Sequence, residues 1–148
     1  MKLIIKNDYD AMCQWAAQHI ADAINNHKEN RPFVLGLPTG SSPLGVYKRL
    51  IEMNKAGEID FSAVTTVNLD EYYPIDPEND QSYRYFMETN LFKHINIPTE
   101  STHVLSGLAA DPEAECGNYE AMIDAAGGID LQILGLGNNG HIALNEPA

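Results

Sequence analysis

A histidine and a carboxylate stand close together in a glycine-rich stretch of this chain. An apolar run leads into Gly135-Leu136-Gly137, and His141 and Glu146 follow within the next nine residues. Glycine lets the backbone turn sharply and come close to a ligand. An imidazole and a carboxylate beside such a turn are the groups that general acid–base catalysis uses. The sequence therefore predicts acid–base chemistry in this segment.

The neighbours of His141 favour a functional histidine over one that only holds a loop. Asn139 and Glu146 are both able to orient an imidazole. The other four histidines have no partner at metal-ligand spacing, so we interpret them as surface or packing residues: His19, His27, His94 and His103. We expect no metal site and no cofactor.

A second segment carries small and hydroxyl-bearing residues between an expected strand and an expected helix. Thr39, Gly40, Ser41 and Ser42 stand there, directly before Pro43. Backbone N–H groups, hydroxyls and a helix N-terminus together form a cradle for an anion. No Gly-Lys-Ser/Thr run follows, so the segment is not a Walker loop. It predicts a phosphate site, and a plain capped turn between strand and helix is the alternative.

Asp70 and Glu71 end a third segment, after an apolar strand-like run. Adjacent side chains of an extended chain point to opposite sides, so only one of the two acids can face a shared cleft. We expect this to be Asp70, because an aspartate at the carboxyl end of a strand is suited to act as a general base. A solvated turn or a helix cap is the alternative interpretation.

The elements that must position these three segments alternate between strand and helix. We expect strands at residues 3–5, 33–37, 64–69, 103–105 and 129–136. Four helices are expected to separate them: one through residues 12–24, one that opens at 42–43 and ends at Gly57, one at about residues 81–94, and one that starts at 111–112 and stops at 127–128. This alternation indicates an α/β fold with a doubly wound, mostly parallel sheet and helices on both faces, a Rossmann-like three-layer sandwich. Ligands of such sheets bind beyond the carboxyl ends of the strands, where all three segments stand.

Particular residues fix the expected helix faces and ends. Met12, Ala16, Ile20 and Ile24 have the four-residue spacing of a buried stripe, and Val46, Leu50 and Met53 mark the next one. Ser42 is the expected N-cap of the second helix. Tyr85, Phe86 and Leu91 are expected to face inward from the third. Asp111-Pro112 starts the fourth, and Gly127-Gly128 stops it.

Composition places the chain among ordinary globular proteins. It has 148 residues, of which 44% are apolar and 20% charged, which fits one domain over residues 1–148. The net charge of −12 argues against nucleic acid and anionic membranes as partners, and it requires a local positive field for any anionic ligand. Cys13 and Cys116 match no metal or disulfide spacing, as in a reducing cytoplasm, where we expect the protein to reside.

The three segments together resemble the glucosamine-6-phosphate deaminase family. The resemblance rests on Leu35-Gly36-Leu37-Pro38-Thr39-Gly40-Ser41-Ser42-Pro43, Asn68-Leu69-Asp70-Glu71-Tyr72 and Gly140-His141-Ile142-Ala143-Leu144-Asn145-Glu146-Pro147, in this order. The related 6-phosphogluconolactonases share the fold and the phosphate loop. They differ after the glycine-histidine step, where an Ala-Ser-Leu-Phe-Pro type of run stands in place of Ile-Ala-Leu-Asn-Glu-Pro.

The resemblance implies aldose–ketose isomerisation and deamination of glucosamine 6-phosphate to fructose 6-phosphate and ammonia, in amino-sugar catabolism. Thr39, Gly40, Ser41 and Ser42 would bind the phosphate, and His141, oriented by Glu146, would relay the proton for ring opening. Asp70 would take the C2 proton and return it to C1 through an enediol-like intermediate, and Glu71 would point away. A lactonase-like enzyme and a non-catalytic sugar-phosphate sensor on the same fold are the alternatives. A sensor needs the phosphate cradle but not the pair of Asp70 and His141.

Two departures from the family pattern stand out. Many members have aspartate where this chain has Asn139, and an amide can orient an imidazole but cannot stabilise its cation by charge. The resembled enzymes also continue past Ala148, and none of the nine Lys and Arg residues lies in the three segments. We therefore expect a domain whose C-terminal part is missing, with an exposed flank on its last strand and negligible activity by itself. For the whole protein we expect a homo-oligomer.

Overall fold

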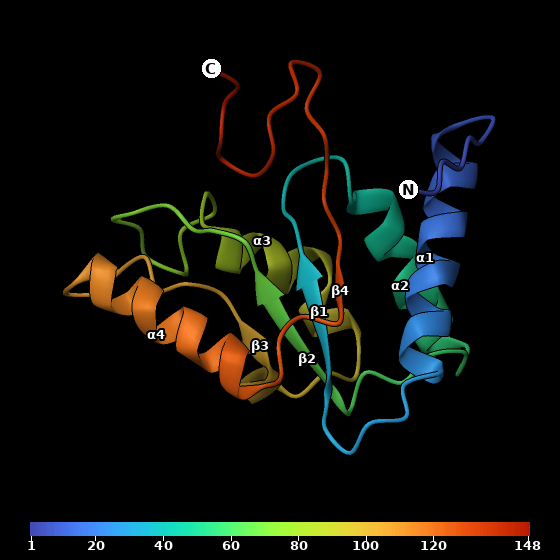
Figure 1. The fold of residues 1–148 in the computed structure, drawn as a ribbon, viewed down its shortest axis with the longest axis horizontal. Coiled ribbons are helices and arrows are strands. Elements are labelled where there is room, and N and C mark those ends of the chain that lie inside the picture. Colours follow the sequence, from blue (N-terminus) through green and yellow to red (C-terminus); the bar gives the residue numbers. More distant parts are fainter.

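The four strands of this protein form one parallel sheet in the order β3-β2-β1-β4. The computed structural model describes all residues from 1 to 148. The strands are β1 (Phe33–Leu37), β2 (Val64–Asn68), β3 (Thr102–His103) and β4 (Leu131–Gln132). The helices are α1 (Tyr9–Asn25), α2 (Leu44–Lys55), α3 (Tyr83–Asn90) and α4 (Pro112–Ala125) (Figure 1), and two single 3₁₀ turns span Phe92–His94 and Thr99–Ser101.

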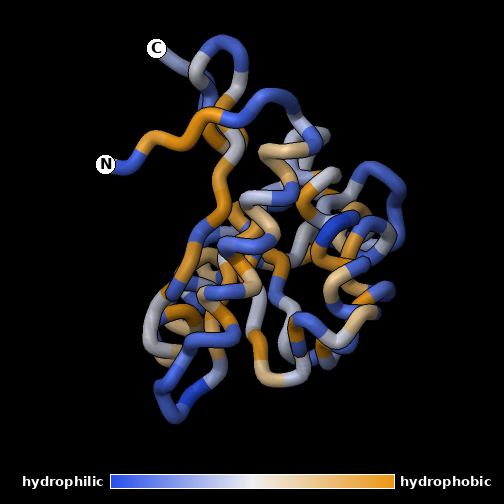
Figure 2. Tube along the Cα trace, turned by 90° about the vertical axis from the view of Figure 1, so that its right-hand side faces the viewer, coloured by the Kyte–Doolittle hydropathy of each residue, from blue (hydrophilic) through white to orange (hydrophobic).

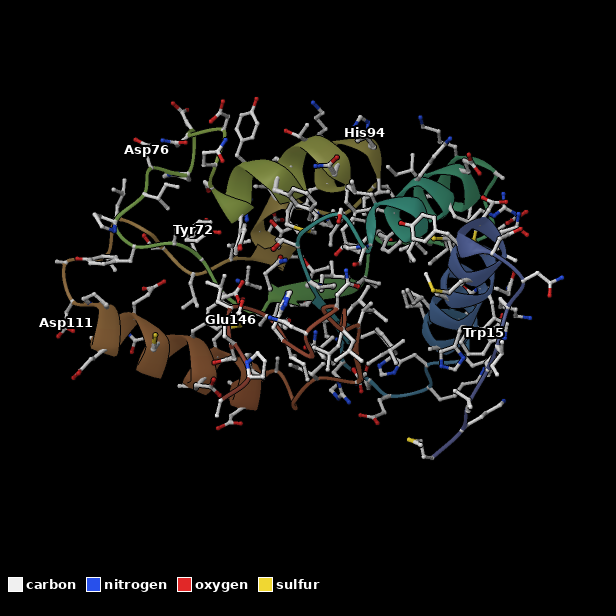
Figure 3. The ribbon with its side chains drawn as sticks, turned by 90° about the horizontal axis from the view of Figure 1, so that it is seen from above. Trp15, Tyr72, Asp76, His94, Asp111 and Glu146 are labelled. Carbon is white, nitrogen blue, oxygen red and sulfur yellow. The ribbon has the colours of Figure 1, made fainter.

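The sheet carries helices on both sides. Figure 3 shows α2 and α3 on one side of the strands and α4 on the other. The main apolar core lies on the first side, and α1, α2, β1 and α3 all contribute fully buried side chains to it, among them Ile20, Leu35, Leu50 and Met87. The prediction of a doubly wound parallel sheet is confirmed. No helix combines the length and the apolar character that crossing a membrane requires.

The pairing of β1 with β2 sets the position of the carboxyl ends. Their register runs from Phe33 opposite Val64 to Leu37 opposite Asn68, so both strands end at the same level. All five residues of β1 are buried, as in a central strand covered on both faces. The segments that follow β1 and β2 therefore leave the sheet side by side.

The buried face of α1 differs from the expected stripe. Met12 is 43% exposed, whereas Cys13, Ala17, Ile20 and Ala21 are buried. Three of these four side chains are small, and they let α1 pack closely on α2: a Cβ placed on Gly45 would lie 2.5 Å from the Cys13 sulfur. The face of α1 that packs closely on α2 is therefore the one with small side chains, and Met12 lies outside it.

The start of α2 corrects the expectation that Ser42 is its N-cap. Pro43 occupies that position and makes no side-chain cap, and the helix begins at Leu44. Tyr9 of α1 takes over the role, because its hydroxyl accepts a hydrogen bond from the Gly45 N–H at 3.0 Å and donates to the Ser42 carbonyl at 2.8 Å. A tertiary contact therefore replaces the local cap. Val46, Leu50 and Met53 are buried as expected.

The third expected helix is shorter than predicted, and the fourth is confirmed. The Ser82 side chain caps α3, which ends at Asn90, and a separate 3₁₀ turn follows. Tyr85 is 41% exposed and does not face inward, whereas Met87 and Leu91 are fully buried. Leu91 leaves the helical conformation with φ −144°, which breaks the helix at this point. Asp111 caps α4, which ends before Gly127 as predicted.

Three of the expected strands are wrong in existence or extent, and the one at residues 103–105 is found only as Thr102–His103. Residues 3–5 form no strand: Leu3 and Ile5 are 78% and 82% exposed, and Figure 2 shows this apolar segment leaving the body of the molecule. No neighbouring strand offers this segment its N–H and C=O groups, and an isolated strand is not stable. The expected strand at 129–136 pairs only over Leu131–Gln132, and Leu134 and Leu136 beyond it are exposed.

Candidate functional site

A cavity of about 490 Å³ opens at the carboxyl ends of β1, β2 and β4. Its walls come from residues 38–42 after β1, residues 69–70 after β2, residues 135–146 after β4, and Tyr83 at the start of α3. The chain runs outward from β1 through β2 to β3 and then returns to place β4 on the other side of β1. Such a reversal of strand order is the place where open α/β sheets bind ligands. The structure brings all three predicted segments to this one cavity.

The 39–42 turn forms one wall, and two tyrosines hold it from behind. Thr39, Gly40, Ser41 and Ser42 all line the cavity. Gly40 has φ +90°, a conformation that glycine adopts without strain. The Tyr47 hydroxyl of α2 donates to the Pro38 carbonyl, and the Tyr9 hydroxyl donates to the Ser42 carbonyl. With the N-terminus of α2 directly behind it, this wall suits an anion.

Asp70 and Glu71 turn to opposite sides, as expected. Asp70 lines the cavity and is half-buried. Burial raises the pKa of the Asp70 carboxyl, the nearby Leu144 N–H lowers it, and the negative charge of Glu71 raises it further. A carboxylate with a raised pKa is a stronger base than an exposed one, which suits proton abstraction.

The backbone that carries Asp70 is fixed by contacts at Asn68, two residues earlier. The buried Asn68 amide donates to the Leu37 carbonyl at 3.0 Å, which ties the end of β2 to the end of β1. The Tyr119 hydroxyl of α4 accepts from the Asn68 N–H at 2.9 Å and lies 2.8 Å from the Asn68 carbonyl and 3.0 Å from that of His103. Sequence reasoning missed Tyr119, because its partner stands 51 positions away.

The histidine loop connects His141 to Glu146 through Asn139. The Asn139 side-chain oxygen lies 2.8 Å from the His141 Nδ1, and its nitrogen donates to a Glu146 oxygen at 2.6 Å. With Nδ1 donating to this amide oxygen, Nε2 carries the free lone pair and can accept a proton. Glu146 thus contacts the imidazole only through Asn139, which does not itself line the cavity.

Gly137 is required by the packing of this loop. A Cβ at this position would lie 2.0 Å from the His141 Nδ1, closer than any real contact. The Gly137 N–H also donates to the His141 carbonyl at 2.9 Å. Glycine at 137 therefore lets the imidazole lie against the backbone of its own loop.

Tyr83 is a cavity residue that the sequence did not single out. Its hydroxyl donates to that of Tyr72 at 3.1 Å, and the two rings lie 4.8 Å apart. Burial raises the pKa of Tyr83, and the hydrogen bond to Tyr72 adds to the effect. The phenol is thus neutral at physiological pH. No lysine or arginine lines the cavity.

A family model described as glucosamine-6-phosphate isomerases/6-phosphogluconolactonase matches residues 7–144. The chain belongs to this family. A glucosamine-6-phosphate deaminase of Lachnoclostridium phytofermentans is 56% identical over 99% of this chain and 61% of its own length. That of Phocaeicola vulgatus is 53% identical over 99% of this chain and 57% of its own length. The chain thus spans about three-fifths of these curated relatives.

Solved structures agree with the family. A monomeric glucosamine-6-phosphate deaminase, 39% identical, superposes with a TM-score of 0.90 over 96% of this chain and 58% of its own. A 6-phosphogluconolactonase from Thermotoga maritima, 23% identical, superposes with a TM-score of 0.76 over 96% of this chain and 62% of its own, which shows the shared fold. The resemblance stated from the sequence is confirmed.

Proposed function

We propose that this chain carries the phosphate turn and the acid–base residues of a glucosamine-6-phosphate deaminase. The observation that carries the proposal is the single cavity lined by the 39–42 turn, Asp70 and His141. Curated relatives at 53–56% identity that bear this name support it. The overall reaction converts glucosamine 6-phosphate and water to fructose 6-phosphate and ammonia.

Ring opening is the step assigned to His141. The sugar is a cyclic hemiacetal, and its C2 proton becomes acidic only once C1 is a free aldehyde. His141 Nε2 takes the proton from the C1 hydroxyl and delivers it to the ring oxygen as the bond from that oxygen to C1 breaks. The hydrogen bond from Nδ1 to Asn139 keeps Nε2 available, and the contact from Asn139 to Glu146 holds the amide in place.

Proton transfer between C2 and C1 is the step assigned to Asp70. The carboxylate removes the C2 proton, the electron pair moves onto the carbonyl, and the C1 oxygen takes a proton from solvent to give an enolamine. Asp70 then returns the proton to C1, which leaves an iminium group at C2. Water adds there, and ammonia departs. The raised pKa of Asp70 suits a group that must both take and give back a proton.

The 39–42 turn is assigned to the phosphate. Three hydroxyls, from Thr39, Ser41 and Ser42, line this wall with the N-terminus of α2 behind them. Each charge-assisted hydrogen bond to a phosphate contributes about 1.5–3 kcal/mol. The phosphate would thereby anchor one end of the sugar while C1 and C2 lie between Asp70 and His141.

Ammonia release tests the proposal. The assay compares this 148-residue chain with the same chain joined to the part of the Lachnoclostridium relative that it does not span. We expect the joined protein to release ammonia from glucosamine 6-phosphate and its Asp70→Asn variant to release almost none. Hydrolysis of 6-phosphogluconolactone with no ammonia release would favour the lactonase alternative. Sugar-phosphate binding without either reaction would favour a sensor.

We propose a small sugar phosphate as the ligand, a cytoplasmic location and a homo-oligomeric whole protein. The relative that superposes with a TM-score of 0.90 is described as monomeric, so the oligomeric state needs its own measurement. Sedimentation velocity on the joined protein gives it directly.

A further inference from the structure

Tyr83 occupies a place in the cavity that the proposed mechanism leaves without a role. It is the one lining residue that comes from α3. Both Thr39 and Asp70 lie near enough to affect the pKa of its hydroxyl, and both line the same cavity. Tyr83 thus stands between the wall assigned to the phosphate and the residue assigned to the C2 proton.

We propose that Tyr83 is a substrate-binding residue whose hydroxyl contacts the sugar between its phosphate and its reacting carbon, and that Glu71 holds it there. The inference rests on the proposed function. The 39–42 turn, Asp70 and Tyr83 line the same cavity, so a sugar phosphate that spans from the turn to Asp70 is brought close to Tyr83. Sugar hydroxyls both donate and accept hydrogen bonds, and a phenol does the same.

The state of the phenol supports this role. Burial and the neighbouring hydroxyl of Tyr72 raise the pKa of Tyr83, so its proton stays on the oxygen. In the free protein this hydroxyl donates to Tyr72 at 3.1 Å. Tyr72 is exposed and can accept a hydrogen bond from water instead. The Tyr83 proton can therefore turn to a ligand without leaving a buried acceptor unpaired.

Glu71 anchors the start of α3 and with it Tyr83. One carboxylate oxygen accepts from the backbone N–H of Tyr83 at 2.9 Å. The other accepts from the Ser82 hydroxyl at 2.8 Å and from the Arg84 N–H at 3.0 Å. A carboxylate that accepts from the first N–H groups of a helix stabilises that end. Because Asp70 and Glu71 are adjacent, the same two residues set the general base and the helix that carries Tyr83.

Calorimetry on the joined protein with 2-amino-2-deoxyglucitol 6-phosphate tests the proposal. This reduced open-chain sugar lacks the carbonyl and cannot react. Tyr83→Phe removes one neutral hydrogen bond and is expected to weaken binding about 2- to 10-fold. Inorganic phosphate, which reaches only the 39–42 turn, is expected to bind both proteins equally. The matched control is Tyr85→Phe, which removes an exposed hydroxyl of the same helix outside the cavity.

A double-mutant cycle tests the part played by Glu71. We expect Glu71→Ala to weaken binding of the reduced sugar, and the Glu71→Ala/Tyr83→Phe double variant to bind no worse than Glu71→Ala alone. Additive losses would overturn the assignment of Glu71.

Three other results would overturn the assignment of Tyr83. Equal affinity of Tyr83→Phe and the unaltered protein for the reduced sugar would remove it from the site. An equal loss for inorganic phosphate would place its contact at the phosphate instead. Failure of the unaltered protein to bind the reduced sugar would overturn the proposed function together with this inference, and that result is recognised before any variant is made.

Discussion

Replacement of Tyr119 by phenylalanine tests how the end of β2 is held. The Tyr119 hydroxyl pairs with the N–H and the carbonyl of Asn68, a residue that is 3% exposed, and lies 3.0 Å from the His103 carbonyl. Without it the Asn68 N–H has no partner and little access to water. Leaving one buried polar group unpaired costs about 1–3 kcal/mol.

This loss of unfolding free energy can be expressed as a change in melting temperature. The entropy of unfolding is about 2.1 cal/mol/K per residue, or about 0.3 kcal/mol/K for this chain, so each kcal/mol corresponds to about 3 °C. Tyr119→Phe is therefore expected to lower the melting temperature by about 3–10 °C. Circular dichroism at 222 nm follows the transition, and urea unfolding gives the free energy independently.

The control is Tyr85→Phe, which removes an exposed tyrosine hydroxyl from α3. We expect its melting temperature to change by less than about 1 °C, as for most surface substitutions. Equal melting temperatures for Tyr119→Phe and the unaltered chain would refute the claim that this hydroxyl holds Asn68. Another contact would then have to hold the backbone that carries Asp70.

Three further predictions concern the cavity. Gly137→Ala displaces the His141 ring and is expected to abolish ammonia release by the joined protein, whereas Gly135→Ala, whose Cβ would lie 3.7 Å from Ser42, should retain most activity. Asp70→Asn is expected to keep affinity for the reduced sugar in calorimetry, lose incorporation of solvent deuterium at C1, and melt higher at neutral pH. Burial raises the pKa of Asp70, so ionisation costs stability above the folded pKa, and the gain in melting temperature should vanish below the ordinary pKa of 3.8. Glucosamine without phosphate is expected to bind at least about 10-fold more weakly by calorimetry. Equal affinities for the sugar with and without phosphate would show that the 39–42 turn only caps a helix and binds no phosphate.

Strand–helix alternation was enough to predict the sheet and its layers. Long apolar runs such as residues 33–37 become central strands because burial on both faces demands apolar residues throughout. The segment at residues 3–5 is also apolar throughout, yet it forms no strand. A strand forms only where a neighbouring strand can pair with it, and the local sequence pattern does not show whether such a strand is present.

Site residues that follow a strand could be predicted from the sequence. Site residues that reach the cavity or its supporting backbone from a helix could not. Asp70, His141 and the 39–42 turn each follow a strand, so the topology alone brings them together. Tyr83 and Tyr119 lie on helices, where tyrosine is ordinary and gives no signal. Likewise, the link from His141 to Glu146 through Asn139 depends on a turn whose geometry the residue spacing does not specify.

The most direct test of the shared cavity is a titration of the isotope-labelled chain with 2-amino-2-deoxyglucitol 6-phosphate, followed in amide ¹H–¹⁵N spectra. The account predicts that the amides of the 39–42 turn, Asp70 and residues 137–144 shift together along one binding curve. The indole signal of Trp15, which lies at one edge of the molecule away from Glu146, should not shift (Figure 3). Shifts confined to one of the three segments, or none at saturating ligand, would contradict the claim that they form one sugar-phosphate site.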